Sequence, residues 1–97
     1  MNIFFLPDVL EELDKAVDFY NAERPGLGYE FAAEVRNALN RIKNYPDSWP
    51  SISLNIRKCL VNRFPFAVLY HREDERLIVV AVMHMKRRPG YWKDRKP

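Results

Sequence analysis

The sequence is poor in cysteine and histidine, and this shortage excludes two kinds of stabilised or catalytic site. A chain of 97 residues with Cys59 as its one cysteine cannot form an internal disulfide, and we expect Cys59 to be a buried or half-buried strand residue. The only histidines are His71 and His84, and no spacing of these residues is typical of a metal site. We therefore expect no metal ion and no other cofactor.

Long apolar runs are also missing. No stretch approaches the roughly 18 consecutive apolar residues of a membrane span. Residues 1–6 are apolar but too few for the core of a signal peptide, and no basic flank precedes them. We expect a cytoplasmic protein without membrane contact. A hydrophobic content of 47% in 97 residues predicts one folded domain, residues 1–97, with a modest core.

The formal net charge of +3 conceals an uneven distribution along the chain. Residues 1–56 carry five basic and nine acidic side chains, whereas residues 57–97 carry eleven and four. The basic half is interleaved with aromatic residues, a combination that suits a nucleic-acid surface because cations meet phosphates and rings stack on bases. The alternative is a basic surface that serves only solubility. The aromatic residues concerned are Phe64, Phe66, Tyr70, Tyr91 and Trp92.

The first half of the chain has the pattern of a strand followed by two helices. Residues 2–6 form a short apolar run that ends at Pro7, and Asp8 with Glu11 three residues later has the form of a capping box. Apolar residues then recur every three or four positions through Tyr20, which predicts an amphipathic helix with Glu12 facing water. Residues 23–28 break this helix. The same spacing restarts at Phe31 and ends at residues 44–46, so an antiparallel helical hairpin is expected. Tyr20 and Tyr45 are expected in the core.

The second half has the pattern of three strands. We predict them at residues 54–61, 66–70 and 77–83, with a charged hairpin loop at residues 71–76. The run 77–83 is apolar on both alternating faces, which indicates a strand covered on both sides. Trp49, between two prolines, is expected to close an edge of the core. The element order predicts an α+β fold, β-α-α-β-β-β, with the helical hairpin on one face of a mostly antiparallel sheet.

Four groups of residues carry a resemblance to a known family. They are Arg24-Pro25-Gly26-Leu27-Gly28 with Phe31; Arg57-Lys58; Arg63-Phe64-Pro65-Phe66 leading to Tyr70; and residues 80–84 followed by Arg87, Pro89, Tyr91 and Trp92. In this order and spacing they cover nearly the whole chain. The sequence resembles the RelE/ParE family of bacterial type II toxins, often labelled plasmid-stabilisation proteins.

The resemblance implies a toxin that arrests growth and is neutralised by a cognate antitoxin, whose tail would fold on the basic half of the chain. RelE-like members cleave messenger RNA on the ribosome without a metal, whereas ParE-like members poison DNA gyrase and are not known as nucleases. We expect a ribosome-dependent messenger-RNA endonuclease. The alternatives are a gyrase inhibitor and a non-toxic corepressor. In each case operator DNA would be reached only through the antitoxin.

Metal-free RNA cleavage needs a proton-transfer group and cations on the phosphate. His84 and Tyr91 are the candidates for proton transfer, with Arg63 and Arg87 completing the catalytic set. The predicted RNA-binding and phosphate-binding residues are Arg57, Lys58, Arg88 and Trp92. A shared site requires the His84 side chain to lie within about 10 Å of Arg57 and Arg87, because proton transfer works over hydrogen-bond distances.

Several of these residues have structural alternatives. Tyr91 and Trp92 are equally suited to packing the end of the chain onto the sheet, and Arg63 to pairing with an acidic residue of the helices. Met85 stands where the RelE-like pattern has an arginine, which leaves that catalytic set incomplete. A histidine followed closely by arginine after the last strand also occurs in many ParE-like members.

Overall fold

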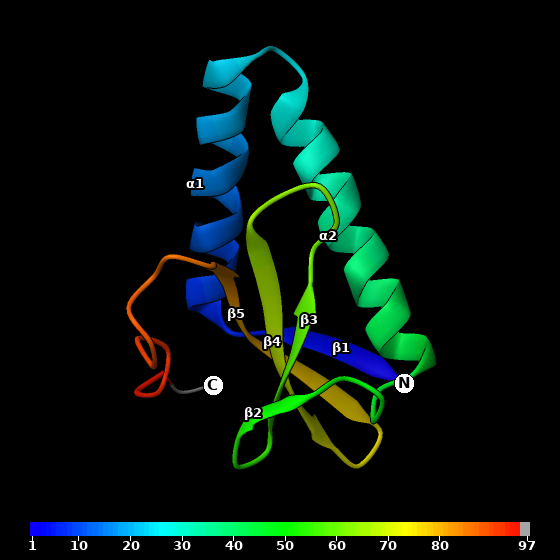
Figure 1. Cartoon of the computed structure of the whole chain (residues 1–97). Coiled ribbons are helices and arrows are strands. Elements are labelled where there is room, and N and C mark those ends of the chain that lie inside the picture. The colour runs from blue at the N-terminus through cyan, green and yellow to red at the C-terminus, as the bar shows by residue number, and fades with distance from the viewer. Residues whose placement is uncertain (96–97) are drawn as a thin grey trace.

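The computed structural model describes residues 1–95, which form two helices and one five-stranded sheet (Figure 1). The sheet order is β1-β5-β4-β3-β2; β1 runs parallel to β5 and the other neighbours are antiparallel. The predicted α+β class and helical hairpin are confirmed. The elements are β1 (Asn2–Phe5), α1 (Pro7–Glu23), α2 (Leu27–Asn44), β2 (Ser51–Ser53), β3 (Ile56–Leu60), β4 (Phe66–Glu73) and β5 (Arg76–His84).

The strand predicted at residues 54–61 is wrong in its first part, because the chain turns there. β2 ends at Ser53 and pairs back onto β3 through Leu54 and Asn55. Asn55 has a φ of +67°, in the left-handed region that asparagine tolerates better than most residues. The apolar residues on both sides of this turn made the segment look continuous in the sequence.

The ends of both helices also differ from the prediction. The N-cap of α1 is Leu6, without a side-chain hydrogen bond, so the predicted capping box of Asp8 and Glu11 is wrong. Pro7 begins the helix because its ring presets the helical φ and its missing N–H is not needed there. α2 begins at Leu27, earlier than Phe31, after Gly26 with a φ of +90°.

The two helices approach closely at Gly28. A Cβ atom there would lie 2.2 Å from the Val17 carbonyl oxygen, and the Gly28 N–H donates to Asn21 Oδ1 at 2.8 Å. Only glycine therefore allows this crossing. Tyr20 packs against the core, as expected, but Tyr45 is exposed, because it follows the last turn of α2 as its C-cap.

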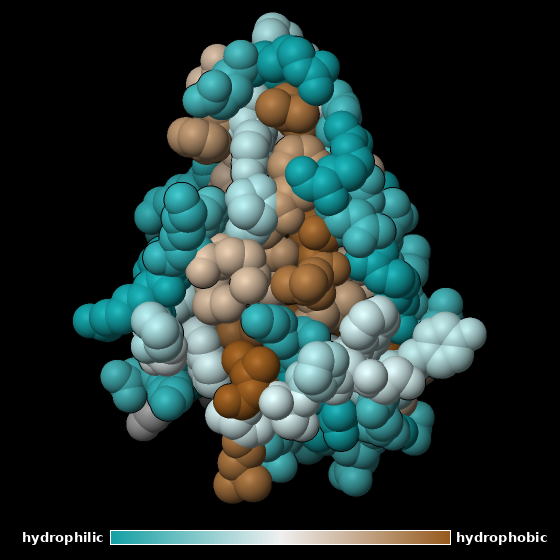
Figure 2. Space-filling view, viewed as in Figure 1, coloured by the Kyte–Doolittle hydropathy of each residue, from teal (hydrophilic) through white to brown (hydrophobic). Residues whose placement is uncertain are grey.

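The main core lies between the helices and one face of the sheet. It contains Cys59, which was predicted as a buried or half-buried strand residue and is fully buried in β3, and Trp49 packs against the edge of this core. Apolar surface shows between the two helices above the strands, with hydrophilic side chains on the outer faces of the helices (Figure 2). The other main members are Val9, Phe31, Val35, Ala38, Ile42, Val68, Tyr70, Val79 and Val82.

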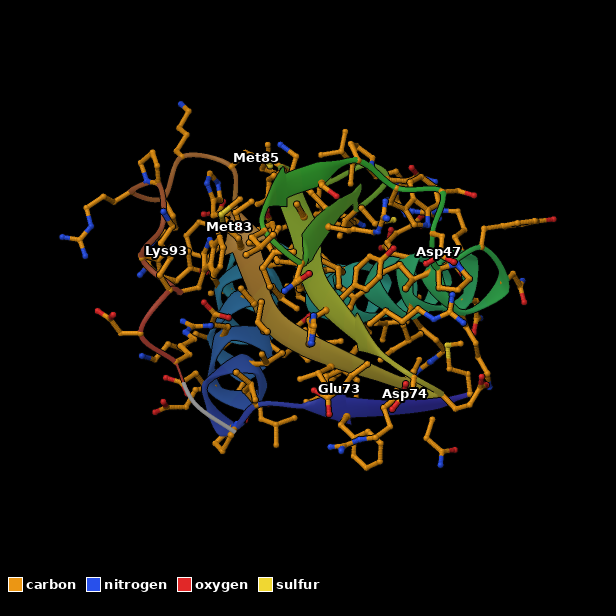
Figure 3. The ribbon with its side chains drawn as sticks, turned by 90° about the horizontal axis from the view of Figure 1, so that it is seen from below. Asp47, Glu73, Asp74, Met83, Met85 and Lys93 are labelled. Carbon is orange, nitrogen blue, oxygen red and sulfur yellow. The ribbon has the colours of Figure 1, made fainter. Side chains whose placement is uncertain are left out.

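A smaller core covers the opposite face of the sheet. Trp92, from the segment after β5, packs on Ala67, Leu69 and Ala81, and this confirms that β5 is covered on both sides. Met83 and Met85 lie at the same end of the sheet as Lys93 of that segment (Figure 3). Residues 85–95, called the C-terminal segment below, therefore belong to the packed fold.

The charged loop predicted at residues 71–76 is mostly strand. β4 continues to Glu73 and β5 begins at Arg76, so only Asp74 and Glu75 form the turn, with Asp74 at a φ of +55°. Glu73 and Arg76 pair across the turn at 3.6 Å. Charged side chains are accommodated here because residues 73–76 are exposed to solvent.

Candidate functional site

A groove of about 440 Å³ runs between α1, the end of β5 and the C-terminal segment. It brings together three of the residues singled out from the sequence, His84, Arg87 and Tyr91. Its floor is apolar and its rim carries charges of both signs. The floor consists of Ala16, Phe19, Tyr20, Phe66 and Val82, and the rim of Asp8, Glu11, Glu12, Lys15, His84, Arg87, Tyr91 and Arg95.

Glu12 holds the C-terminal segment against this groove. Its side chain is only 14% exposed, so the prediction that it faces water is wrong. The carboxylate accepts hydrogen bonds from the Tyr91 hydroxyl, from both terminal nitrogens of Arg95 at 2.8 Å, and from the Val82 N–H at 3.1 Å. Arg95 also donates to the Val80 carbonyl at 2.9 Å. The two side chains thus satisfy backbone groups of β5 that lie beyond the end of β1.

Sequence reasoning missed both members of this pair. Glu12 is one of several acidic residues on α1, and 83 positions separate it from Arg95. The sequence held one signal for Glu12. Asp8, Glu12 and Ala16 are spaced by four residues and lie on one helix face, and the apolar Ala16 indicates that this face contacts the rest of the fold.

Tyr91 acts in this arrangement as a hydrogen-bond donor. Partial burial, together with the hydrogen bond to the Glu12 carboxylate, raises the pKa of the Tyr91 hydroxyl well above its ordinary value. The Arg87 guanidinium lies 3.9 Å from the centre of the Tyr91 ring, and that of Arg95 lies 4.9 Å away. Two cations therefore stack on a ring whose proton is retained, an arrangement that favours a structural role over proton abstraction.

His84 is held by its neighbours at the rim of the groove. Its Nδ1 accepts a hydrogen bond from the Lys86 N–H at 3.0 Å, which in the neutral ring places the proton on Nε2. The ring meets Phe66 edge to face, with the ring centres 5.1 Å apart. His84 lines the groove, and in this tautomer its Nε2 is the ring's hydrogen-bond donor.

Arg63 takes the structural alternative. Its guanidinium binds Glu30 at 2.7 Å and lies 3.7 Å from Glu34, both on α2. The hydrogen bond with Glu30 raises the pKa of Arg63 and lowers that of Glu30. Arg63 has a φ of +71°, in the left-handed region. Its pairing with Glu30 and Glu34 holds the loop between β3 and β4 against α2.

Arg57 lies away from His84, opposite the middle of β4. In the register of β4, Arg57 is opposite Tyr70 and His84 is opposite Phe66, which separates them by roughly 13 Å along the strand at about 3.3 Å per residue. The Arg57 guanidinium donates to the Trp49 carbonyl at 2.6 Å. The structure therefore does not bring Arg57 to the groove of His84 and Arg87.

The remaining predicted residues are dispersed. Lys58 is opposite Leu69, so it faces the side of the sheet away from Arg57. Arg88 is exposed beside Arg87 in a shallow hollow next to the groove. Trp92 is buried in the smaller core, so its ring is not free to stack on a base.

The groove combines apolar and charged contacts. The exposed ring of Phe19 and the apolar floor offer anchors for apolar side chains, and the rim carries the acidic residues Asp8 and Glu11 as well as the cations Lys15 and Arg87. Among residues 1–95 no three His, Cys, Asp or Glu side chains are grouped so that they could hold a metal ion. No helix of the described residues is long and apolar enough to cross a membrane.

Comparison with known proteins identifies one family and one fold. Residues 3–89 match the family model described as "ParE toxin of type II toxin-antitoxin system, parDE". A solved structure, "Chromosomal ParDE TA system from P. aeruginosa", shares the fold with a TM-score of 0.76; the alignment covers 87% of this chain and 95% of that chain at 14% identity. No curated protein is similar enough in sequence to count as a match.

Proposed function

Because the chain belongs to the ParE toxin family of type II toxin-antitoxin systems, we propose that it arrests growth by inhibiting DNA gyrase, without cleaving RNA. The family match over residues 3–89 carries this proposal. From the sequence we expected messenger-RNA cleavage as the main function and gyrase inhibition as an alternative; the proposal now places gyrase inhibition first. Gyrase as the target also implies action in the cytoplasm.

Two of the predicted catalytic residues are held by structural partners, and this supports gyrase inhibition over RNA cleavage. Tyr91 donates to Glu12, and Arg63 pairs with Glu30. Arg57, which was predicted to bind phosphate, lies roughly 13 Å along the sheet from His84 and donates to the Trp49 carbonyl. A nuclease would need these groups together at one phosphate, since charge stabilisation and proton transfer act on the same reacting atoms.

We further propose that a cognate antitoxin neutralises the chain by laying a helical or extended tail in the groove along α1. Phe19 and Phe66 would receive apolar anchors of the tail. The exposed cations Lys86, Arg87 and Arg88 beside the groove would attract an acidic tail and accelerate its association. Operator DNA would then be reached through the antitoxin.

A second function, ribosome-dependent cleavage of messenger RNA, is favoured by one observation. His84 and Arg87 line the same groove, so a proton-transfer group and a phosphate-binding cation are close to each other. In this case the ribosome and its message would be the partners, and His84 would be essential.

Induced expression of the wild type and His84→Ala separates the two functions. Primer extension on a reporter message and gels of plasmid topoisomers are read from the same cells. We expect arrest with intact message and altered supercoiling in both strains. New 5′ ends within translated message that vanish in His84→Ala would establish the nuclease instead. A wild type that does not slow growth would leave only the corepressor role.

A further inference from the structure

The C-terminal segment carries an excess of positive charge. Its one acidic side chain is Asp94, and its five basic side chains are Lys86, Arg87, Arg88, Lys93 and Arg95. Arg95 is bound to Glu12. The other four are exposed, and none of them forms an ion pair with another of residues 1–95. Lys86, Arg87, Arg88 and Lys93 are called the basic cluster below.

Basic side chains elsewhere in the fold are either paired or scattered. Those paired with a carboxylate are Arg24, Arg63, Arg72 and Arg76. Those that are exposed without an acidic partner in the described residues stand apart on the two helices, and they are Lys15, Arg36 and Lys43. Asp8, which shares a shallow hollow with Arg87 and Arg88, lies 3.8 Å from the Arg95 guanidinium. The basic cluster therefore has charge available for a partner outside the chain.

The backbone holds the basic cluster in consecutive tight turns. Each of these turns has an N–H that donates to the carbonyl three residues earlier, at 3.0 to 3.2 Å, and the donors are Arg87, Tyr91, Lys93 and Arg95. The Met85 N–H donates to the Pro65 carbonyl at 2.8 Å, and Trp92 is buried in the smaller core. The segment projects from the end of β5 beside the start of α1 (Figure 1). Because this backbone is already ordered, a partner would have to order only the exposed side chains.

We propose that the basic cluster binds the sugar-phosphate backbone of duplex DNA, and that the chain thereby contacts the DNA that gyrase holds as well as gyrase itself. This inference rests on gyrase inhibition as the function. A duplex carries one negative charge for roughly every 1.7 Å of its axis, so several cations of a compact cluster meet phosphates together. Arg87, stacked on the Tyr91 ring at 3.9 Å, keeps its in-plane N–H groups for phosphate oxygens. An acidic antitoxin tail in the groove along α1 would compete with DNA for the same cations.

The aromatic residues of the segment favour a duplex over a single strand. Proteins bind single-stranded nucleic acid largely by stacking its unpaired bases on aromatic rings. Trp92 is only 8% exposed, because it packs on the sheet. The Tyr91 ring carries the guanidinium groups of Arg87 and Arg95, and its hydroxyl is bound to Glu12. Neither ring is free for a base, whereas contacts to the backbone of a duplex need only cations and hydrogen-bond donors.

Fluorescence anisotropy of a labelled DNA duplex, titrated with the purified chain at several salt concentrations, tests the contact without gyrase. Four phosphate contacts predict a slope of about −3.6 for the logarithm of the binding constant against that of the salt concentration. The double variant Lys86→Gln/Arg88→Gln should halve this slope to about −1.8 and weaken binding on the order of 100-fold at about 50 mM salt. Arg36→Gln/Lys43→Gln is the matched control, because it removes the same charge from exposed positions on α2 and should leave the slope unchanged. Both double variants should keep the wild-type Tm, since all four side chains are exposed and unpaired.

Equal slopes for the two double variants, or binding of single-stranded RNA of the same length as tightly as the duplex, would overturn the DNA contact. Supercoiling by purified gyrase then tests whether the contact serves inhibition. Lys86→Gln/Arg88→Gln should need roughly tenfold more protein or above for half-inhibition than the wild type or the control variant. Equal inhibition by all three would overturn the contact on the gyrase complex and leave gyrase inhibition standing. A wild type that binds the duplex but leaves gyrase active would contradict gyrase inhibition and leave the DNA contact standing.

Discussion

Glu12→Gln should destabilise the fold far more than its position on a surface helix suggests. The substitution keeps the size of the side chain but removes the charge that Arg95 faces at 2.8 Å. Both side chains are more than 80% buried, at 14% and 13% exposure, so solvent cannot fully replace the lost partner. Removal of one partner of a buried pair costs about 3–5 kcal/mol, and the retained hydrogen-bonding capacity of glutamine reduces our expectation to about 2–3 kcal/mol.

The assay is thermal and urea unfolding of the purified chain. A loss of about 2–3 kcal/mol corresponds to a fall in Tm of roughly 8–24 °C for a domain of this size. Glu11→Gln is the control, because Glu11 is the exposed neighbour and makes the same change in charge; its effect should stay within about 0.5 kcal/mol. Equal Tm values for Glu12→Gln and Glu11→Gln would refute the role of Glu12 in holding the C-terminal segment.

Three further predictions concern other parts of the fold. Gly28→Ala should cost about 1–3 kcal/mol, measured by urea unfolding, because its Cβ would meet the Val17 carbonyl oxygen. The pKa of Tyr91 is raised in the folded chain. The contribution of Tyr91 to the unfolding free energy is therefore complete below its unfolded pKa near 10 and is lost as the pH rises through the folded value. Tyr91→Phe should flatten the loss of stability that urea unfolding measures in alkaline solution. The hydrogen bond from Arg63 lowers the pKa of Glu30 in the folded chain. The contribution of the Glu30 carboxylate to the unfolding free energy is therefore present above its unfolded pKa near 4.3 and is lost as the pH falls through the folded value. Arg63→Met should weaken the acid dependence of the unfolding free energy.

The sequence predicted the helical hairpin and the central strands because their apolar residues repeat with the period of each element. Cys59 was correctly placed in a strand of the core, and β5 was correctly placed between two layers. These features depend on local pattern and on burial, both of which are visible in the sequence.

The missed features depend on contacts between distant residues or on single backbone angles. The turn at Asn55 needs one positive φ in a run that otherwise alternates like a strand. The bond between Glu12 and Arg95 joins the first helix to the end of the chain. Arg63 and Tyr91 were recognised as polar residues of interest, but their partners, Glu30 and Glu12, could be known only from the fold.

The supercoiling of relaxed plasmid by purified DNA gyrase, with the purified chain added, tests the proposed function most directly. Inhibition by the wild type and by His84→Ala alike is the expected result, because the proposed activity needs no proton transfer. Full gyrase activity, together with His84-dependent cleavage of messenger RNA in a translating extract, would contradict it.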